Sequence, residues 1–202
     1  MSNAVENLLP AMLPWVSPDA VLPLARHFRR GNYSKGFTLV RQGEVFGHAL
    51  LVETGALRLF FTQEDGREFN KNFFSEGHLV LPLTGRMATS PSLFGVAALE
   101  RARVWLAPMA EFKGALAAMG LWHTVQRKLL AAMVNEKLRR EHDLLALNGT
   151  ERYNKFCLEH PSLSNRIPVA QLASYLGLTS VSLSRIRTAC KQQAASASQR
   201  TA

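Results

Sequence analysis

The chain of 202 residues is 47% hydrophobic and 19% charged, which is typical of a globular protein with enough apolar side chains for one large domain or two modest ones. Its formal net charge of +9 at pH 7 favours an acidic partner. The excess is concentrated near one end, because residues 148–202 hold 7 Lys and Arg against 2 Asp and Glu. A solvated basic surface without a partner is the alternative explanation of this charge.

Cysteine use and the N-terminal run exclude several protein classes. Cys157 and Cys190 lie far apart, without a CxxC or Cys/His spacing, which argues against a disulfide framework, a zinc site and an iron–sulfur cluster. The apolar run LLPAMLPWV is short, has no basic flank and contains two prolines, so it is neither a signal peptide nor a membrane span. We therefore expect a cytoplasmic protein with no membrane partner, no metal and no cofactor.

The first predicted elements are short helices over residues 8–30, where Pro18 and Asp19 suit the first turn of a helix running toward Arg29. From residue 31 the pattern changes to short runs rich in Val, Leu and Phe, punctuated by glycines at 43, 55, 66 and 77. This rhythm predicts an antiparallel barrel or sandwich. Asp65-Gly66, between LRLFFT and REFNKNFF, predicts a hairpin with a type I′ turn.

After Pro108 the pattern is helical, with a short segment from Met109 to Met119 and a long one from Leu121 to about Leu147. The long segment carries two apolar stripes, and a helix with two apolar faces can pack on its own domain and on a second copy. Burial of both stripes within one chain is the alternative. The expected homodimer interface comprises Trp122, Val125, Leu129, Leu130, Met133 and Val134.

Asn148 and Glu151 form a capping-box pattern before the helix ERYNKFCLEH, and we place a domain boundary there. At the other end, residues 193–202 read QAASASQRTA, which is small and polar. This composition predicts a disordered tail.

Residues 166–187, RIPVAQLASYLGLTSVSLSRIR, predict a helix-turn-helix. Leu172 and Leu176 share one helix face, Gly177 ends that helix, and Leu183 returns the second helix to the first. The second helix then presents small hydroxyls and a cation on its outer side, which suits a helix that reads the major groove of DNA. The predicted DNA-binding residues are Thr179, Ser180, Val181, Ser182, Ser184, Arg185 and Arg187.

This order of parts resembles the CRP/FNR superfamily of transcription regulators. The resemblance is carried by ERYNKF, by NRIPVAQLASYLGLTSVSLSRIR and by the glycines in RQGE, ETGALRLFF and EDGRE. It implies an α+β fold: a cyclic-nucleotide-binding-like antiparallel β-roll (a double-stranded β-helix) at 1–120, a dimerisation helix at 121–147 and a helix-turn-helix domain of winged-helix type at 148–192. By similarity, base contacts fall to Ser180, Val181, Ser182 and Arg185.

The resemblance implies a homodimer that binds an inverted repeat in double-stranded DNA, with RNA polymerase and an unknown small-molecule effector as further partners. It does not indicate the operator, the sign of regulation or the effector. The residues beyond Arg187 leave little room for the family's β-wing, so we expect the wing to be short, displaced before Ile167 or cut away.

The sequence departs from the family in the effector region. Cyclic-nucleotide binders of the family carry a Gly-Glu pair and, about ten residues later, an Arg-Ser or Arg-Thr pair. Here Ser92-Leu93 stands where that second pair is expected, and Arg86, on an expected exposed loop, is the nearby cation. We expect an effector other than a cyclic nucleotide, with a pocket near Gly77, Leu81, Arg86, Ser92 and Phe94. A cyclic-nucleotide-responsive regulator with a non-standard phosphate site is the alternative.

Two other function classes are alternatives to a regulator. A cupin-like metalloenzyme needs closely spaced histidines, and the six histidines here stand singly without an H-x-H pair, so we expect no enzyme. An interaction module that has lost DNA binding would share the architecture. Salt-dependent binding to duplex DNA would separate that module from a regulator.

Overall fold

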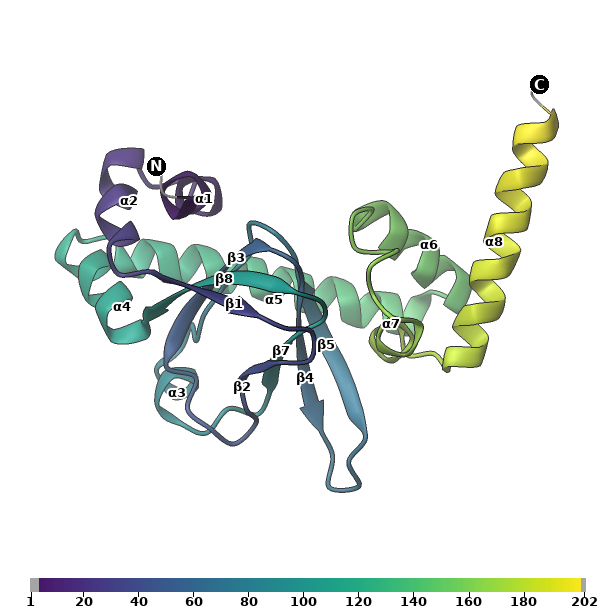
Figure 1. The fold of residues 1–202 in the computed structure, drawn as a ribbon, viewed down its shortest axis with the longest axis horizontal. Coiled ribbons are helices and arrows are strands. Elements are labelled where there is room, and N and C mark those ends of the chain that lie inside the picture. Colours follow the sequence, from purple (N-terminus) through teal and green to yellow (C-terminus); the bar gives the residue numbers. More distant parts are fainter. Residues whose placement is uncertain (1–3, 201–202) are drawn as a thin grey trace. The chain divides into compact units, whose positions relative to one another are not determined.

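The computed structural model describes residues 4–200 and the side chains of residues 4–193 (Figure 1). The described residues divide into two compact units. The first lies within Met1–Arg67 and Lys71–Asn135, and the second within Glu68–Asn70 and Glu136–Ala202.

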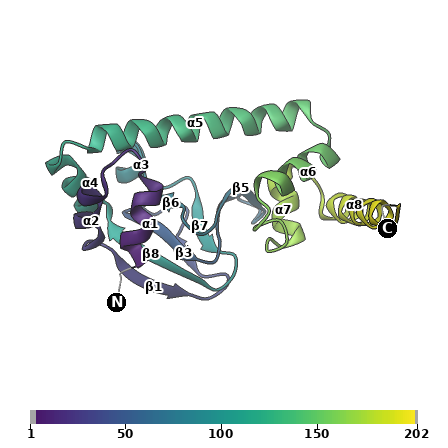
Figure 2. The ribbon, with the colours of Figure 1, turned by 90° about the horizontal axis from the view of Figure 1, so that it is seen from above.

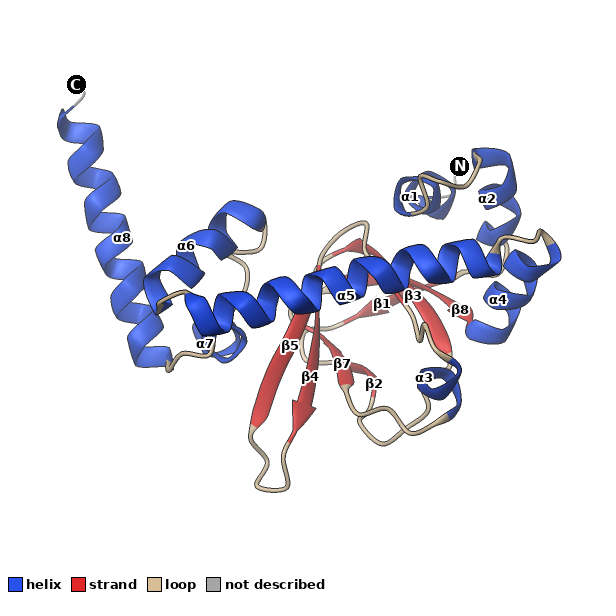
Figure 3. Ribbon diagram, turned by 180° about the vertical axis from the view of Figure 1, so that it is seen from behind, coloured by secondary structure: helices blue, strands red, loops and turns tan. Residues whose placement is uncertain are grey.

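The first unit is built on two antiparallel four-stranded sheets, drawn in red in Figure 3. One sheet has the order β1-β8-β3-β6 and the other β2-β7-β4-β5. The strands are β1 Arg29–Tyr33, β2 Thr38–Val40, β3 His48–Thr54, β4 Leu57–Thr62, β5 Glu68–Phe74, β6 Leu79–Val80, β7 Gly95–Ala98 and β8 Ala102–Pro108. The prediction of a glycine-punctuated β domain is confirmed.

Two of the punctuating glycines show why the residue is needed. Gly55 has φ +89°, and a Cβ there would lie 2.7 Å from the carbonyl oxygen of Arg101, so both conformation and space exclude a side chain. Gly66 has φ +82°, but Asp65 before it does not have positive φ. The predicted type I′ turn is therefore wrong. The Gln63 N–H donates to the Arg67 carbonyl and the Gly66 N–H to the Gln63 carbonyl, as in a three-residue loop ending in a left-handed glycine.

Four helices complete the β domain: α1 Ala4–Met12, α2 Pro18–Ala25, α3 Gly85–Thr89 and α4 Met109–Ala118. The predicted helix toward Arg29 ends at Ala25, and Arg29 begins β1. Side chains of α1, α2 and α4 form a core with one face of the sheet β1-β8-β3-β6, while a second core lies between the sheets. The second core contains Val40, Phe46, Leu50, Val52, Leu57, Val80, Val96, Ala98, Ala102 and Val104.

The long helix α5 runs unbroken from Trp122 to Ala146, after a turn at Gly120 with φ +70° (Figure 2). Three helices follow: α6 Gly149–Glu159, α7 Val169–Leu176 and α8 Ser180–Arg200. The capping box of Asn148 and Glu151 is present at the start of α6, as predicted. Between α6 and α7, residues 160–168 form turns and contain no strand of a wing.

The tail differs from the sequence prediction. Residues 193–202 were expected to be disordered, but α8 continues to Arg200, and residues 201–202 lie outside the described residues. The alanines and glutamines of this segment favour a helix, and it contains neither glycine nor proline to end one.

Candidate nucleic-acid interface and effector region

The helix-turn-helix forms as the sequence predicted. Gly177 ends α7 in the left-handed conformation, with φ 67°, and Thr179 caps α8 because its Oγ1 accepts the Ser182 N–H at 3.1 Å. Leu183 is fully buried and holds the inner side of α8. The second unit's core also contains Phe156, Leu163, Ile167, Leu172, Ala173 and Leu176.

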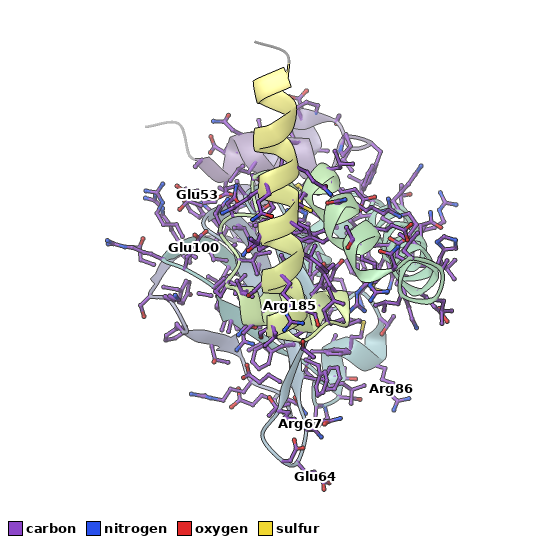
Figure 4. The ribbon with its side chains drawn as sticks, turned by 90° about the vertical axis from the view of Figure 1, so that its right-hand side faces the viewer. Glu53, Glu64, Arg67, Arg86, Glu100 and Arg185 are labelled. Carbon is purple, nitrogen blue, oxygen red and sulfur yellow. The ribbon has the colours of Figure 1, made fainter. Side chains whose placement is uncertain are left out.

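The first turns of α8 present a short polar surface to solvent. Side chains there are exposed, including Val181 at 60%, and Figure 4 shows Arg185 near the start of the helix. The exposed predicted residues are Thr179, Ser180, Val181, Ser182, Ser184 and Arg185. Because no Asp or Glu follows Glu159 in the sequence, no acidic side chain of this segment opposes an approaching phosphate.

Arg187, predicted to bind DNA, has internal partners instead. Its Nη2 donates to the Ser164 carbonyl, and its Nε lies 3.4 Å from the Tyr153 hydroxyl. Burial raises the pKa of Tyr153, and Arg187 opposes this effect. The half-buried guanidinium therefore ties α8 to α6 and to the turn after it, which the sequence pattern did not indicate.

The apolar stripes of α5 also differ from the prediction in part. Trp122 and Val125 are buried in the core of their own β domain, at 6% and 0% exposure, so they are not available to a second copy. Leu129 and Leu130 pack partly against the same core. The exposed large apolar side chains lie further along the helix: Met133 at 36%, Val134 at 48%, Leu138 at 58%, Leu144 at 37% and Leu145 at 83%.

Known proteins with similar folds include several regulators. Residues 30–118 match the family model of the cyclic nucleotide-binding domain. FixK2 from Bradyrhizobium japonicum is similar with a TM-score of 0.66 and 24% identity, over 83% of this chain and 86% of that one. The Thermus thermophilus Catabolite Activator Protein has a TM-score of 0.55 and 22% identity, over 91% and 87%. No curated protein matches the sequence.

A third structure, described as a transcriptional regulator of the CRP/FNR family from Eubacterium rectale, has a TM-score of 0.70 and 16% identity, over 93% of this chain and 88% of that one. The chain has the CRP/FNR fold. As in the sequence prediction, this fold joins a β-roll of the cyclic-nucleotide-binding type, a long helix and a helix-turn-helix.

Within the CRP/FNR fold, the predicted effector residues fall into separate groups. Gly77 lies beside Met12 of α1, and Leu81 is buried in the core formed with the helices, so neither faces the space between the sheets. Arg86 is exposed on α3, a short helix capped by Thr84 where the sequence suggested a loop, and it points away from the sheets (Figure 4). These three residues do not converge on one pocket.

Ser92 and Phe94 follow α3 in the chain and hydrogen-bond to each other. The Ser92 hydroxyl donates to the Phe94 carbonyl at 2.7 Å and accepts the Phe94 N–H at 3.2 Å, so its hydrogen bonds are already made locally. Lys71, which the sequence reasoning missed, has its Nζ 4.3 Å from the centre of the Phe94 ring. Phe61 packs edge-on against that ring.

The segment before α3 is attached to the long helix. The side-chain amide of Gln126, on α5, donates to the carbonyl of Leu83, immediately before the α3 cap. Leu83 itself is buried in the helix-side core. This hydrogen bond connects the segment that precedes α3 to the second turn of α5.

Two other features of the described residues are relevant to the function classes. No helix among them is long and apolar enough to cross a membrane. A search of the same residues for three or more gathered His, Cys, Asp or Glu side chains finds no group that could hold a metal ion.

Proposed function

We propose that the chain is a homodimeric, sequence-specific DNA-binding transcription regulator of the CRP/FNR type, acting in the cytoplasm and catalysing no reaction. The observation that carries this proposal is the exposed N-terminal face of α8. It presents small hydroxyls and Arg185, behind which Leu183 is fully buried.

The chemistry of this face suits the major groove. The Arg185 guanidinium is a planar fork that can donate two hydrogen bonds to O6 and N7 of guanine, while short serines allow the helix to approach the base edges closely. The N-terminal turns of a recognition helix are the part that contacts bases. We therefore assign base reading to Arg185 and to Ser180, Val181, Ser182 and Ser184.

The exposed stripe on α5 supports the homodimer. Val134, Leu138 and Leu145 follow one another at spacings of four and seven residues, which places them on one seam of the helix. A second copy related by a two-fold axis would cover this seam with its own equivalent residues. The dimer would then present two recognition helices, and its operator would be an inverted repeat.

Two observations on the effector region support an effector other than a cyclic nucleotide. A buried cyclic phosphate loses its water shell and needs a paired cation in return. The Ser92 hydroxyl makes its hydrogen bonds to its own segment, and Arg86 is exposed on α3. We therefore propose that a different small molecule, or none, controls the protein.

The test begins with duplexes selected by the protein from genomic fragments. Arg185→Ala should lose about 1–3 kcal/mol of binding to the selected duplex, with a much smaller loss on a scrambled duplex. Lys191→Ala is the matched control, because it removes the same charge from the same exposed helix and should leave discrimination unchanged. Fluorescence anisotropy titrations at one salt concentration measure both.

Two outcomes would contradict the proposal at different levels. An equal loss on both duplexes would show that Arg185 contacts phosphate rather than a base. A wild-type protein that prefers no duplex would favour the interaction module.

A further inference from the structure

Two arginines meet where the C-terminal ends of α5 and α7 come together. Arg140 lies on α5 and Arg152 in the first turn of α6, and both are half-buried. Both belong to the second compact unit, as do their partners. Neither stood out in the sequence, because neither lies in the turn or on α8.

Together they complete the end of α7. The last four carbonyls of an α-helix have no partner within the helix. The turn at Gly177 satisfies the first two of them in α7 with backbone N–H groups. The other two are satisfied by side chains: Arg140 Nη2 donates to the Tyr175 carbonyl at 3.0 Å, and Arg152 Nε donates to the Leu176 carbonyl at 2.8 Å.

Arg152 also reaches the end of α5. Its Nη1 donates to the carbonyl of Leu147 and lies 3.5 Å from that of Leu144. One guanidinium thus lies at the negative ends of two helix dipoles, which stabilise a cation. In its own helix the same cation lies in the first turn, at the positive end of the dipole, where it is disfavoured. The contacts to α5 and α7 therefore account for an arginine at this position.

Further contacts tighten the same joint. The Arg140 guanidinium lies 4.7 Å from the centre of the Tyr175 ring. Burial raises the pKa of Tyr175, an effect that Arg140 opposes. A Cβ at Gly177 would lie 3.2 Å from the Leu144 side chain, so the turn before the recognition helix also packs on α5.

A salt bridge joins α5 to α6 beside the arginines. Lys155 Nζ lies 2.7 Å from the carboxylate of Asp143. Burial alone would raise the pKa of Asp143, but the hydrogen bonds from Lys155 and His142 hold it below its ordinary value. The salt bridge therefore adds a second contact between α5 and α6, one turn further along α6 than Arg152.

We propose that Arg140 and Arg152 are positioning residues that fix the angle between α5 and the recognition helix, and thereby set the half-site spacing that the dimer reads. The inference rests on the function proposed above. In a dimer whose α5 helices pair, the contacts of α5 with α6 and α7 help to hold α8 at a defined angle, together with the hydrogen bonds of Asn70 in β5 to Gln171 and Ser174 in α7. If the joint loosens, each α8 still recognises its half-site, but the pair no longer fits one spacing.

The test compares single half-sites with inverted repeats of graded spacing, all taken from the duplex that the wild type selects. Arg140→Ala and Arg152→Ala should leave half-site binding within about twofold, lower binding to the best full site by about tenfold or more, and flatten the dependence on spacing. Arg152→Lys, which keeps the charge but not the fork, should recover part of the spacing preference. Arg139→Ala, which removes an exposed neighbouring charge on α5, is the control and should behave as wild type.

A second measurement needs no DNA. Spin labels are placed on α5 by Lys137→Cys and on α8 by Thr188→Cys. The native cysteines are removed by Cys157→Ser and Cys190→Ser. When the labelled protein is diluted with unlabelled protein, the distance between the two labels reports the angle between α5 and α8 within one protomer. We expect one narrow distance distribution with both arginines present and a broad one in Arg140→Ala and Arg152→Ala. Unchanged distributions would overturn the inference. The inference would also be overturned if the variants lost affinity equally for the half-site and the full site, in proportion to a loss of thermal stability.

Failure of the proposed function would give a different set of results from failure of this inference. In that case the wild type would prefer no duplex, while the distance distributions would still decide whether the arginines hold the angle.

Discussion

At the scale of single residues, Arg187 shows how helix register decides which cation of α8 is exposed and which has partners inside the domain. Two residues after Arg185 on α8, it is half-buried and donates to the Ser164 carbonyl. Arg187→Ala should lower the free energy of unfolding by about 1–3 kcal/mol, since a buried carbonyl loses a charged donor. Discrimination between duplexes should not change. Urea unfolding measures the free energy of unfolding, and fluorescence anisotropy measures discrimination between duplexes. Arg185→Ala should give the opposite result, with stability unchanged and discrimination lost. If Arg187→Ala kept its stability and lost discrimination, a direct base contact would be indicated.

At the scale of elements, α5 has one apolar face in its own domain and another in solvent. Val134 is 48% exposed in the single chain, whereas Val125 is fully buried. Val134→Glu should therefore fold normally but place a charge in the dimer seam, and sedimentation should show monomer at micromolar concentration. Ala132→Glu, two positions earlier and also exposed, lies on the opposite side of the helix and should stay dimeric. A dimeric Val134→Glu protein would place the interface elsewhere. Leu130 is a poorer probe, because it packs partly on the β domain.

At the scale of the whole molecule, the fold of a cyclic-nucleotide-binding domain is present, but within the described part of the chain the predicted effector residues do not gather at one place. Arg86 is exposed, and Lys71 lies over the Phe94 ring. Calorimetry should show no saturable binding of cyclic AMP or cyclic GMP up to about 1 mM, because the phosphate would be buried without a paired cation. A dissociation constant in the low micromolar range would refute this. Loss of that binding in Arg86→Ala or in Lys71→Ala would then identify which cation serves as the phosphate partner.

Features of short range could be predicted from the sequence alone. The capping box of Asn148 and Glu151, the left-handed turn at Gly177 and the Thr179 cap depend on backbone groups within four residues, so the local residue types suffice. The same holds for the β-roll glycines, whose positive φ requires the absence of a Cβ. The order of domains followed from these signals, and the outward face of α8 followed from its helical period.

Features that depend on a distant partner were decided only by the tertiary structure. The helical period shows that Trp122 and Val134 both lie on apolar faces of the helix. It cannot show that the β domain covers Trp122 and leaves Val134 exposed. Leu81 looked like a pocket residue and is buried against the helices instead. Arg187 has the same charge as Arg185, but it donates to the carbonyl of Ser164, 23 residues earlier in the chain, and lies beside the Tyr153 hydroxyl, whereas Arg185 is exposed. A sequence pattern records which side chains need a partner, while the long-range packing of the chain determines which partner each one finds.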